Sequence, residues 1–232
     1  MLMTKMNPMT MKTSEAVSVN ASDVRELKKL AAEGEGLQLE FKLKAAYPEK
    51  IVREMIAFAN TEGGTLLVGV DDNGRISGVK YPEEEGHVIS EALKKYCRPN
   101  LIYKESIIAI SENKYVVRFD IPPSTKRPHY LMLDKDTKQS FVREKDMSIK
   151  ASPEMEEIVR RSKQKRDIRF TFGDQEKKLM EYLHEHHSIS MQAYQTLSGL
   201  NRFKSRRKLI LLVLANVLKI TASEKGDLYS RT

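Results

Sequence analysis

A strand pattern, a helix pattern and a second strand pattern follow one another closely between residues 37 and 79, and they constrain the fold more than any other feature. In "LQLEFKLK" apolar and polar residues alternate, which predicts a strand with one apolar face and places Glu40 and Lys42 together on the polar face. "PEKIVREMIAFAN" has apolar residues at helical spacing, and "TLLVGV" is apolar enough for an inner strand. "DDNG" predicts a turn into a short strand, "RISGV". The segment therefore predicts a sheet packed against helices.

Mixed structure continues to about Lys150. A helix is predicted in "EEEGHVISEALKKYC", strands in "LIYKESIIAIS" and "YVVRFDI", and a hairpin in "HYLMLDKDTKQSFVR". An earlier helix is expected to begin at Ser22 and to end at Gly34. We therefore predict an α+β domain with a mixed sheet over residues 23–150. Residues 1–22, rich in Met and Thr without a continuous apolar core, are predicted to be a mobile tail and no signal peptide.

The pattern changes after residue 150. "SPEMEEIVRRSKQKRD" predicts a charged helical linker over residues 151–169. Three helices are then expected in "DQEKKLMEYLHEH", from near Ser190 and from near Ser205, followed by two short strands around the turn at Lys225 and Gly226. Helix, helix, helix and hairpin is the order of a winged helix-turn-helix, which we predict for residues 170–232.

Positive charge is concentrated in this last part of the chain. The net charge is +8 overall, and residues 160–232 hold 16 Lys and Arg against seven Asp and Glu, whereas residues 1–159 hold 24 and 25. Clustered cations predict a polyanionic partner, DNA in the first instance. The alternative is a solvated basic helix end on a dimerisation module. The predicted contacts at the start of the third helix and on the wing are Arg202, Lys204, Arg206, Arg207, Lys208, Lys225 and Arg231.

The loop "STKRPHY" is a second candidate for nucleic-acid contact. Lys126, Arg127, His129 and Tyr130 could touch phosphate and stack on an unpaired base. The alternative interpretation is a surface loop stiffened by proline.

Several functional classes are excluded or disfavoured by composition. A single cysteine, Cys97, excludes an intramolecular disulfide and a Cys-rich zinc site, which fits a reducing, cytoplasmic setting. The chain has no apolar run of transmembrane length, so we expect no membrane partner. It also lacks the Walker pattern of a P-loop, so we expect no ATP binding, and we interpret Gly63 and Gly64 as a helix stop and a strand entry.

Four segments carry a resemblance to a known family: "EGEGLQLEFK", "MIAFANTEGGTLLVGVDDNGRISGV", "IPPSTKRPHYL" and "SFVRE". Together they resemble the Schlafen AlbA-type domain over about residues 23–150. In bacteria such domains are often followed by a winged helix and described as transcriptional regulators. The resemblance implies a DNA-binding regulator that needs no cofactor, with RNA as an alternative partner. A homodimer is expected, because a dimer with two-fold symmetry matches the symmetry of a palindromic DNA site.

The same resemblance implies an acidic site, because some Schlafen proteins cleave RNA. Glu35 and Glu40 have the implied spacing, and Asp71 or Asp72 takes the third place. Glu35, Glu40 and Asp71 would bind Mg²⁺ or Mn²⁺, and Lys42 would stabilise charge on the phosphate. The structural alternative is an ion pair between Glu40 and Lys42 on an exposed strand face and an ordinary turn at "DDNG". A metal-dependent endonuclease acting on RNA or single-stranded DNA is thus the alternative to a regulator, and a protein-binding assembly module is the third hypothesis.

Overall fold

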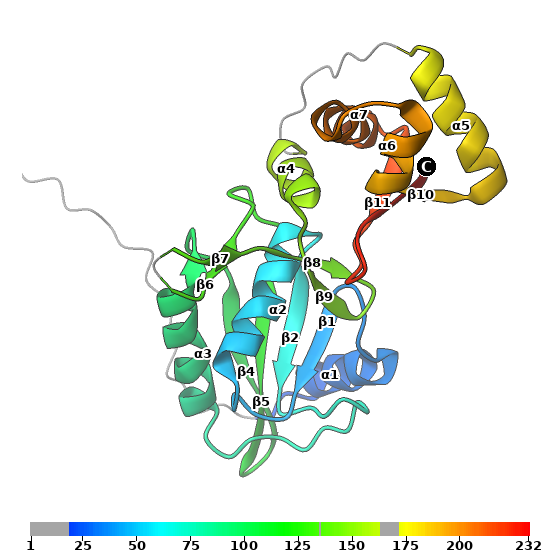
Figure 1. Cartoon of the computed structure of the whole chain (residues 1–232). Coiled ribbons are helices and arrows are strands. Elements are labelled where there is room, and N and C mark those ends of the chain that lie inside the picture. The colour runs from blue at the N-terminus through cyan, green and yellow to red at the C-terminus, as the bar shows by residue number, and fades with distance from the viewer. Residues whose placement is uncertain (1–18, 135, 163–171) are drawn as a thin grey trace, which may run out of the picture.

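A computed structural model describes residues 19–134, 136–162 and 172–232. Residues up to 150 form an N-terminal unit, residues 172–232 form a C-terminal unit, and one helix lies between them (Figure 1). Residues 1–18 of the predicted tail and residues 163–169 of the predicted linker lie outside the described residues. The helices before the C-terminal unit are α1 (Ala21–Glu33), α2 (Pro48–Asn60), α3 (Pro82–Tyr96) and α4 (Pro153–Arg161). The strands there are β1 (Leu39–Lys42), β2 (Gly64–Val68), β3 (Cys97–Arg98), β4 (Lys104–Ser111), β5 (Lys114–Ile121), β6 (Tyr130–Met132), β7 (Lys138–Gln139), β8 (Phe141–Glu144) and β9 (Met147–Lys150).

The main sheet of the N-terminal unit has the order β1-β2-β5-β4. Strand β1 runs parallel to β2, and β5 is antiparallel to both of its neighbours, so the sheet is mixed, as predicted. Two smaller sheets, β3-β6-β7 and β8-β9, lie beside it. The fold class is therefore mixed α and β.

Helices cover both faces of the main sheet. Helices α2 and α3 pack on the face that carries Leu66 and Val68, and α1 packs on the face that carries Leu67 and Val70. Because neighbouring residues of a strand point to opposite faces, a strand buried on both sides is apolar without interruption, as "TLLVGV" is. The same burial makes one prediction wrong. Glu40, expected on an exposed face of β1, is 6% exposed.

The end of α2 joins the main sheet to the smaller sheets. The Asn60 side chain accepts a hydrogen bond from the His129 backbone N–H (2.7 Å) and donates to the carbonyl oxygens of His129 (3.1 Å) and Phe141 (2.9 Å). Gly63 follows with φ of 78°, and a Cβ on it would lie 2.6 Å from the Ile121 carbonyl oxygen. The segment "NTEGG" thus ends the helix, as predicted, and also connects three distant segments.

The "DDNG" segment forms a turn without the strand that was expected after it. The Asp71 carboxylate accepts hydrogen bonds from the backbone N–H groups of Asn73 and Arg75, each 3.0 Å long. Beyond the turn, only isolated bridges join Val70 to Ile76 and Val79 to Tyr115. The predicted strand "RISGV" is therefore reduced to single contacts.

Three helices and a three-stranded sheet make up the C-terminal unit. The elements are α5 (Asp174–His186), β10 (Ser188–Ser190), α6 (Met191–Ser198), α7 (Arg202–Leu214), β11 (Leu218–Thr221) and β12 (Leu228–Arg231). The sheet order is β10-β12-β11, and the strand β10 was not predicted. Leu183, Tyr194, Leu209 and Tyr229 are at the centre of its apolar core.

Two helices begin earlier than the sequence indicated. Helix α7 begins at Arg202, because Asn201 caps it by accepting a hydrogen bond from the Lys204 backbone N–H (2.9 Å), and not near Ser205. Helix α1 likewise has Asn20 as its N-cap in place of Ser22. No helix among the described residues has the length and apolar character needed to cross a membrane.

Candidate nucleic-acid interface

The first turns of α7 carry exposed cations around an exposed aromatic ring. Phe203 is 74% exposed, a position that sequence reasoning did not single out. Arg202, Lys204 and Arg207 are exposed beside it in the sequence, and their side chains make no hydrogen bond or ion pair with another described residue. Cations at a helix N-terminus, where backbone N–H groups are also free, form a surface suited to phosphate.

The other two predicted cations of α7 already have partners within the protein. Lys208 forms an ion pair with the buried carboxylate of Glu176, near the start of α5. Arg206 donates from Nη2 to the Pro153 carbonyl oxygen (2.8 Å), and its Nε lies 3.3 Å from Glu154 Oε1. These two side chains link elements of the structure, whereas the remaining three are free to meet a ligand.

On the β11–β12 hairpin, Lys225 and Arg231 are both exposed. Lys225 lies in the turn, where its backbone N–H donates to Ser223 Oγ (3.1 Å), and Arg231 ends β12. Only Lys225 occupies the tip of the hairpin, where a wing would meet a duplex.

The loop before β6 divides into surface and interior residues. Lys126 is exposed, but Arg127 is partly buried and donates to the Thr61 carbonyl oxygen (2.9 Å) and to Ser162 Oγ (3.1 Å). His129 is 1% exposed, and its ring nitrogens lie 2.8 Å from the Pro99 carbonyl oxygen and 2.6 Å from Ser124 Oγ. The prediction that His129 contacts nucleic acid is therefore wrong, because the ring belongs to the interior.

Folding brings two further cations to Tyr130, one from β7 and one from α4. Lys138 Nζ lies 4.4 Å from the centroid of the Tyr130 ring, and Arg160 Nη2 lies 3.5 Å from the Tyr130 hydroxyl. Arg160 also pairs with Glu157, which offsets part of its charge. Sequence reasoning missed both residues: the pairing of β7 with β6 places Lys138 beside Tyr130, and the contacts of α4 with the Tyr130 hydroxyl place Arg160 there.

Most of the predicted acidic residues already have partners of their own within the protein. Glu40 pairs with Lys42 and with Arg143, whose Nη2 lies 2.6 Å from Glu40 Oε2. Glu35 accepts a hydrogen bond from the Phe41 backbone N–H (2.8 Å). Asp71 caps its own turn, and Asp72 is exposed. Among the described residues, no three His, Cys, Asp or Glu side chains are grouped closely enough to hold a metal ion.

A buried arginine is the cation at the centre of this region. Arg143 has no exposed side-chain surface and contacts Glu40 and, at 2.8 Å, Glu54 Oε2. Its guanidinium also donates to the Gly36 carbonyl oxygen (3.0 Å) and lies over the Phe58 ring. The guanidinium thus takes the place between two carboxylates that a metal ion could otherwise occupy.

A cavity of about 890 Å³ lies beside Glu35, between the end of α1 and the ends of β2 and β5. Its polar lining includes Glu33, Glu35 and Asp120, against the single cation Lys104. A negative lining repels a phosphate backbone. The cavity is therefore poorly suited to hold a nucleic-acid strand.

Burial raises the pKa of Glu35 above its ordinary value, although the Phe41 N–H bond acts in the opposite direction. Glu40 and Asp72 raise the same pKa further through charge repulsion. With a raised pKa in the folded state, Glu35 contributes stability that is present at acidic pH and is lost as pH rises through that pKa. We expect the unfolding free energy of wild type relative to Glu35→Gln to fall as the pH rises above about 4.5, the ordinary pKa of a glutamate carboxyl. Urea unfolding at several pH values measures this, and a difference that rises with pH would contradict it.

Comparison with known proteins agrees with the motifs of the N-terminal unit. The family model described as Schlafen, AlbA_2 matches residues 35–152, and no curated protein matches. One similar solved structure is the N-terminal domain of a protein related to the ATP-dependent DNA helicase RecG from Nitrosomonas europaea, with 22% identity over 50% of this chain and 86% of that one and a TM-score of 0.42. Another is the DIP2311 protein from Corynebacterium diphtheriae, with 16% identity and a TM-score of 0.43; the match covers 89% of this chain and 38% of that one. Because the family match spans just over half of the 232 residues, the chain belongs to the Schlafen AlbA_2 family.

Proposed function

We propose that this protein is a DNA-binding transcriptional regulator in which the C-terminal unit acts as a winged helix-turn-helix. The observation that carries the proposal is the exposed, unpaired set of Arg202, Lys204 and Arg207 at the start of α7. In a winged helix the third helix enters the major groove by this end, and the hairpin that follows contacts the backbone. The order α5, α6, α7 and the β11–β12 hairpin supports that assignment. Membership of the AlbA_2 family is consistent with nucleic-acid binding.

The cations around Tyr130 would add backbone contacts from the N-terminal unit. Lys126 and Lys138 are exposed there, and Arg160 reaches the same ring. Contacts of this kind carry little sequence information and increase affinity through release of counterions. A homodimer, which we retain as a prediction, would present two copies of α7 to a palindromic site.

The endonuclease hypothesis stays a prediction with a structural cost. To bind a metal, Glu40 would have to leave Arg143 and Lys42, and Asp71 would have to leave its turn. Replacing Glu40 would also disturb a buried ion pair, so loss of activity in such a variant would be ambiguous. Asp72 is exposed, so Asp72→Asn is the cleaner test.

Anisotropy titrations of wild type with labelled duplex DNA, single-stranded DNA and structured RNA, each at several salt concentrations, test the proposal. We expect duplex DNA to bind most tightly, with affinity that falls as salt rises. Tighter binding of RNA would contradict the assignment. The same nucleic acids are then incubated with Mn²⁺ and either wild type or Asp72→Asn. Cleavage by wild type that the variant lacks would identify a nuclease and overturn the purely regulatory proposal.

A further inference from the structure

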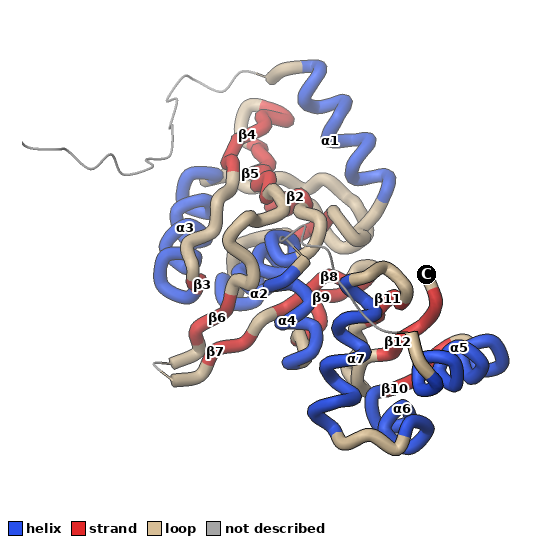
Figure 2. The backbone as a smooth tube through the Cα atoms, turned by 90° about the horizontal axis from the view of Figure 1, so that it is seen from above, coloured by secondary structure: helices blue, strands red, loops and turns tan. Residues whose placement is uncertain are grey.

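Helix α4 contacts the face of α7 that carries Arg206. The two helices lie side by side in both views of the backbone (Figures 1 and 2). Arg206 is held by the Pro153 carbonyl oxygen and by Glu154, which is only 8% exposed. A cation on a predicted DNA-reading helix is therefore bound to a carboxylate of the protein itself.

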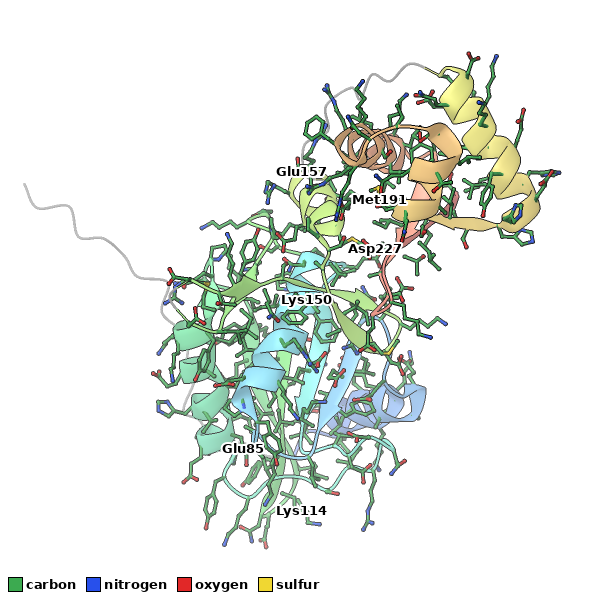
Figure 3. The ribbon with its side chains drawn as sticks, in the orientation of Figure 1. Glu85, Lys114, Lys150, Glu157, Met191 and Asp227 are labelled. Carbon is green, nitrogen blue, oxygen red and sulfur yellow. The ribbon has the colours of Figure 1, made fainter. Side chains whose placement is uncertain are left out.

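The β11–β12 hairpin also contacts the start of α4 and the strand before it. Asp227 accepts a hydrogen bond from Ser152, the N-cap of α4, and Figure 3 shows Asp227 at the junction between the two units. Beside this contact, Ala222 belongs to one apolar cluster with Ile149 of β9 and Met155 of α4. The hairpin thus has both a polar and an apolar attachment to the rest of the chain.

These attachments involve the two elements by which a winged helix approaches a duplex, the third helix and the wing. We propose that the docked arrangement is a closed state, in which Glu154 occupies the place of a DNA phosphate on Arg206 and α4 blocks full approach to the groove. The first turn of α7 stays accessible in this state and can attract DNA by its charge. Tight binding requires the C-terminal unit to separate from α4. This inference rests on the proposed function.

The contacts between the C-terminal unit and the rest of the chain are of a kind that can break reversibly. Among the described residues, the attachment includes one small apolar cluster, the contacts of α4 with α7 around Arg206 and the Ser152–Asp227 hydrogen bond. Interfaces between domains of one chain resemble transient protein–protein contacts unless they are large and apolar. When only a fraction of the molecules is competent to bind, the apparent dissociation constant rises by the inverse of that fraction. Anything that holds the units together therefore weakens DNA binding.

A cross-link between the units tests the proposal directly. In the variant Ser152→Cys/Asp227→Cys the new thiols lie where a hydrogen bond joins the native side chains, and a short bismaleimide can connect them. Cys97, the single native cysteine, is fully buried and burial raises its thiol pKa to about 12, so it should not react. We expect the cross-linked protein to bind duplex DNA at least about tenfold more weakly than the same variant before cross-linking.

The outcomes separate this inference from the proposed function. Equal affinity before and after cross-linking would overturn the closed-state proposal and leave DNA binding intact. Absence of duplex binding by wild type and by the uncross-linked variant would overturn both. A second variant, Glu154→Gln, should bind duplex DNA several-fold more tightly than wild type, because it weakens the hold on Arg206. Glu91→Gln is the matched control: it removes the same charge from an ion pair with Lys94 on α3, outside the proposed interface, so a gain of the same size there would also contradict the proposal.

Discussion

Replacing Arg143 with methionine is expected to lower the free energy of unfolding by about 3 kcal/mol or more. The guanidinium is completely buried and bridges Glu40 on β1, Glu54 on α2 and the Gly36 carbonyl oxygen before β1. Removing it leaves two buried carboxylates without their shared cation, and the cost of an uncompensated buried charge exceeds the loss of the attraction itself. Lys42 and Arg53, which remain beside the carboxylates, keep the effect near the lower end of the range for broken buried pairs.

Urea unfolding followed by circular dichroism measures this loss, and Arg118→Met is its control. Arg118 also contacts two carboxylates, those of Glu26 and Asp120, but on the partly exposed surface of the main sheet. Exposed pairs of this kind contribute about 1 kcal/mol or less. If both variants lost the same stability, burial would not be what makes the Arg143 network important.

Removing two free cations of α7, in Arg202→Ala/Arg207→Ala, is expected to weaken binding of duplex DNA about 10- to 100-fold. Both side chains are exposed and have no partner among the described residues, so their charge is available to phosphate. Each lost phosphate contact should reduce the slope of log affinity against log salt by about one. Anisotropy titrations across a range of salt concentrations give both quantities.

A double variant far from α7 tests whether the loss of affinity depends on the position of the removed charges or only on the net charge. Lys29→Ala/Lys114→Ala removes the same charge from α1 and from the start of β5, and Figure 3 shows Lys114 at the opposite end of the molecule from the C-terminal unit. It should leave the affinity within about twofold of wild type, since charges farther than a Debye length are screened. Equal losses in the two variants would mean that α7 does not form the interface. Phe203→Ala, tested in parallel, should lower affinity without changing the salt slope, because an aromatic ring releases no counterions.

Local sequence patterns were sufficient to predict most of the helices and strands. Alternation, helical spacing and glycine placement correctly indicated β2, α2 and α5, because each reflects which face of one segment is buried. Boundaries were less well predicted where two capping residues compete, as at Ser22 and Asn20 or at Ser205 and Asn201. The short strand β10 was missed because three residues that gain their partner only from β12 have no periodic pattern of their own.

The candidate site was harder to predict, because its residues depend on contacts between distant segments. The types of residue were informative: a cluster of cations at the start of a helix indicated an interface, and its free members are at the surface. The segment around His129 has the basic and aromatic composition of a ligand-binding loop. Asn60, 69 positions earlier in the chain, nevertheless holds His129 in the interior. Glu40 lies at a polar position of the alternating pattern, where an exposed residue is expected. Arg143, 103 positions later in the chain, nevertheless pairs with it in the interior.

By itself the amino-acid sequence determined most of the elements, the mixed class of the fold, the family to which residues 35–152 belong and the concentration of positive charge after residue 160. These properties depend on neighbours in the chain or on composition. Only the tertiary structure decided which charged side chains are free. Arg206 and Arg207 are adjacent and chemically identical, but helical geometry turns one toward Glu154 and leaves the other exposed. Whether a charge is available for a ligand depends on the partners that folding brings to it, and those partners are separated from it in sequence.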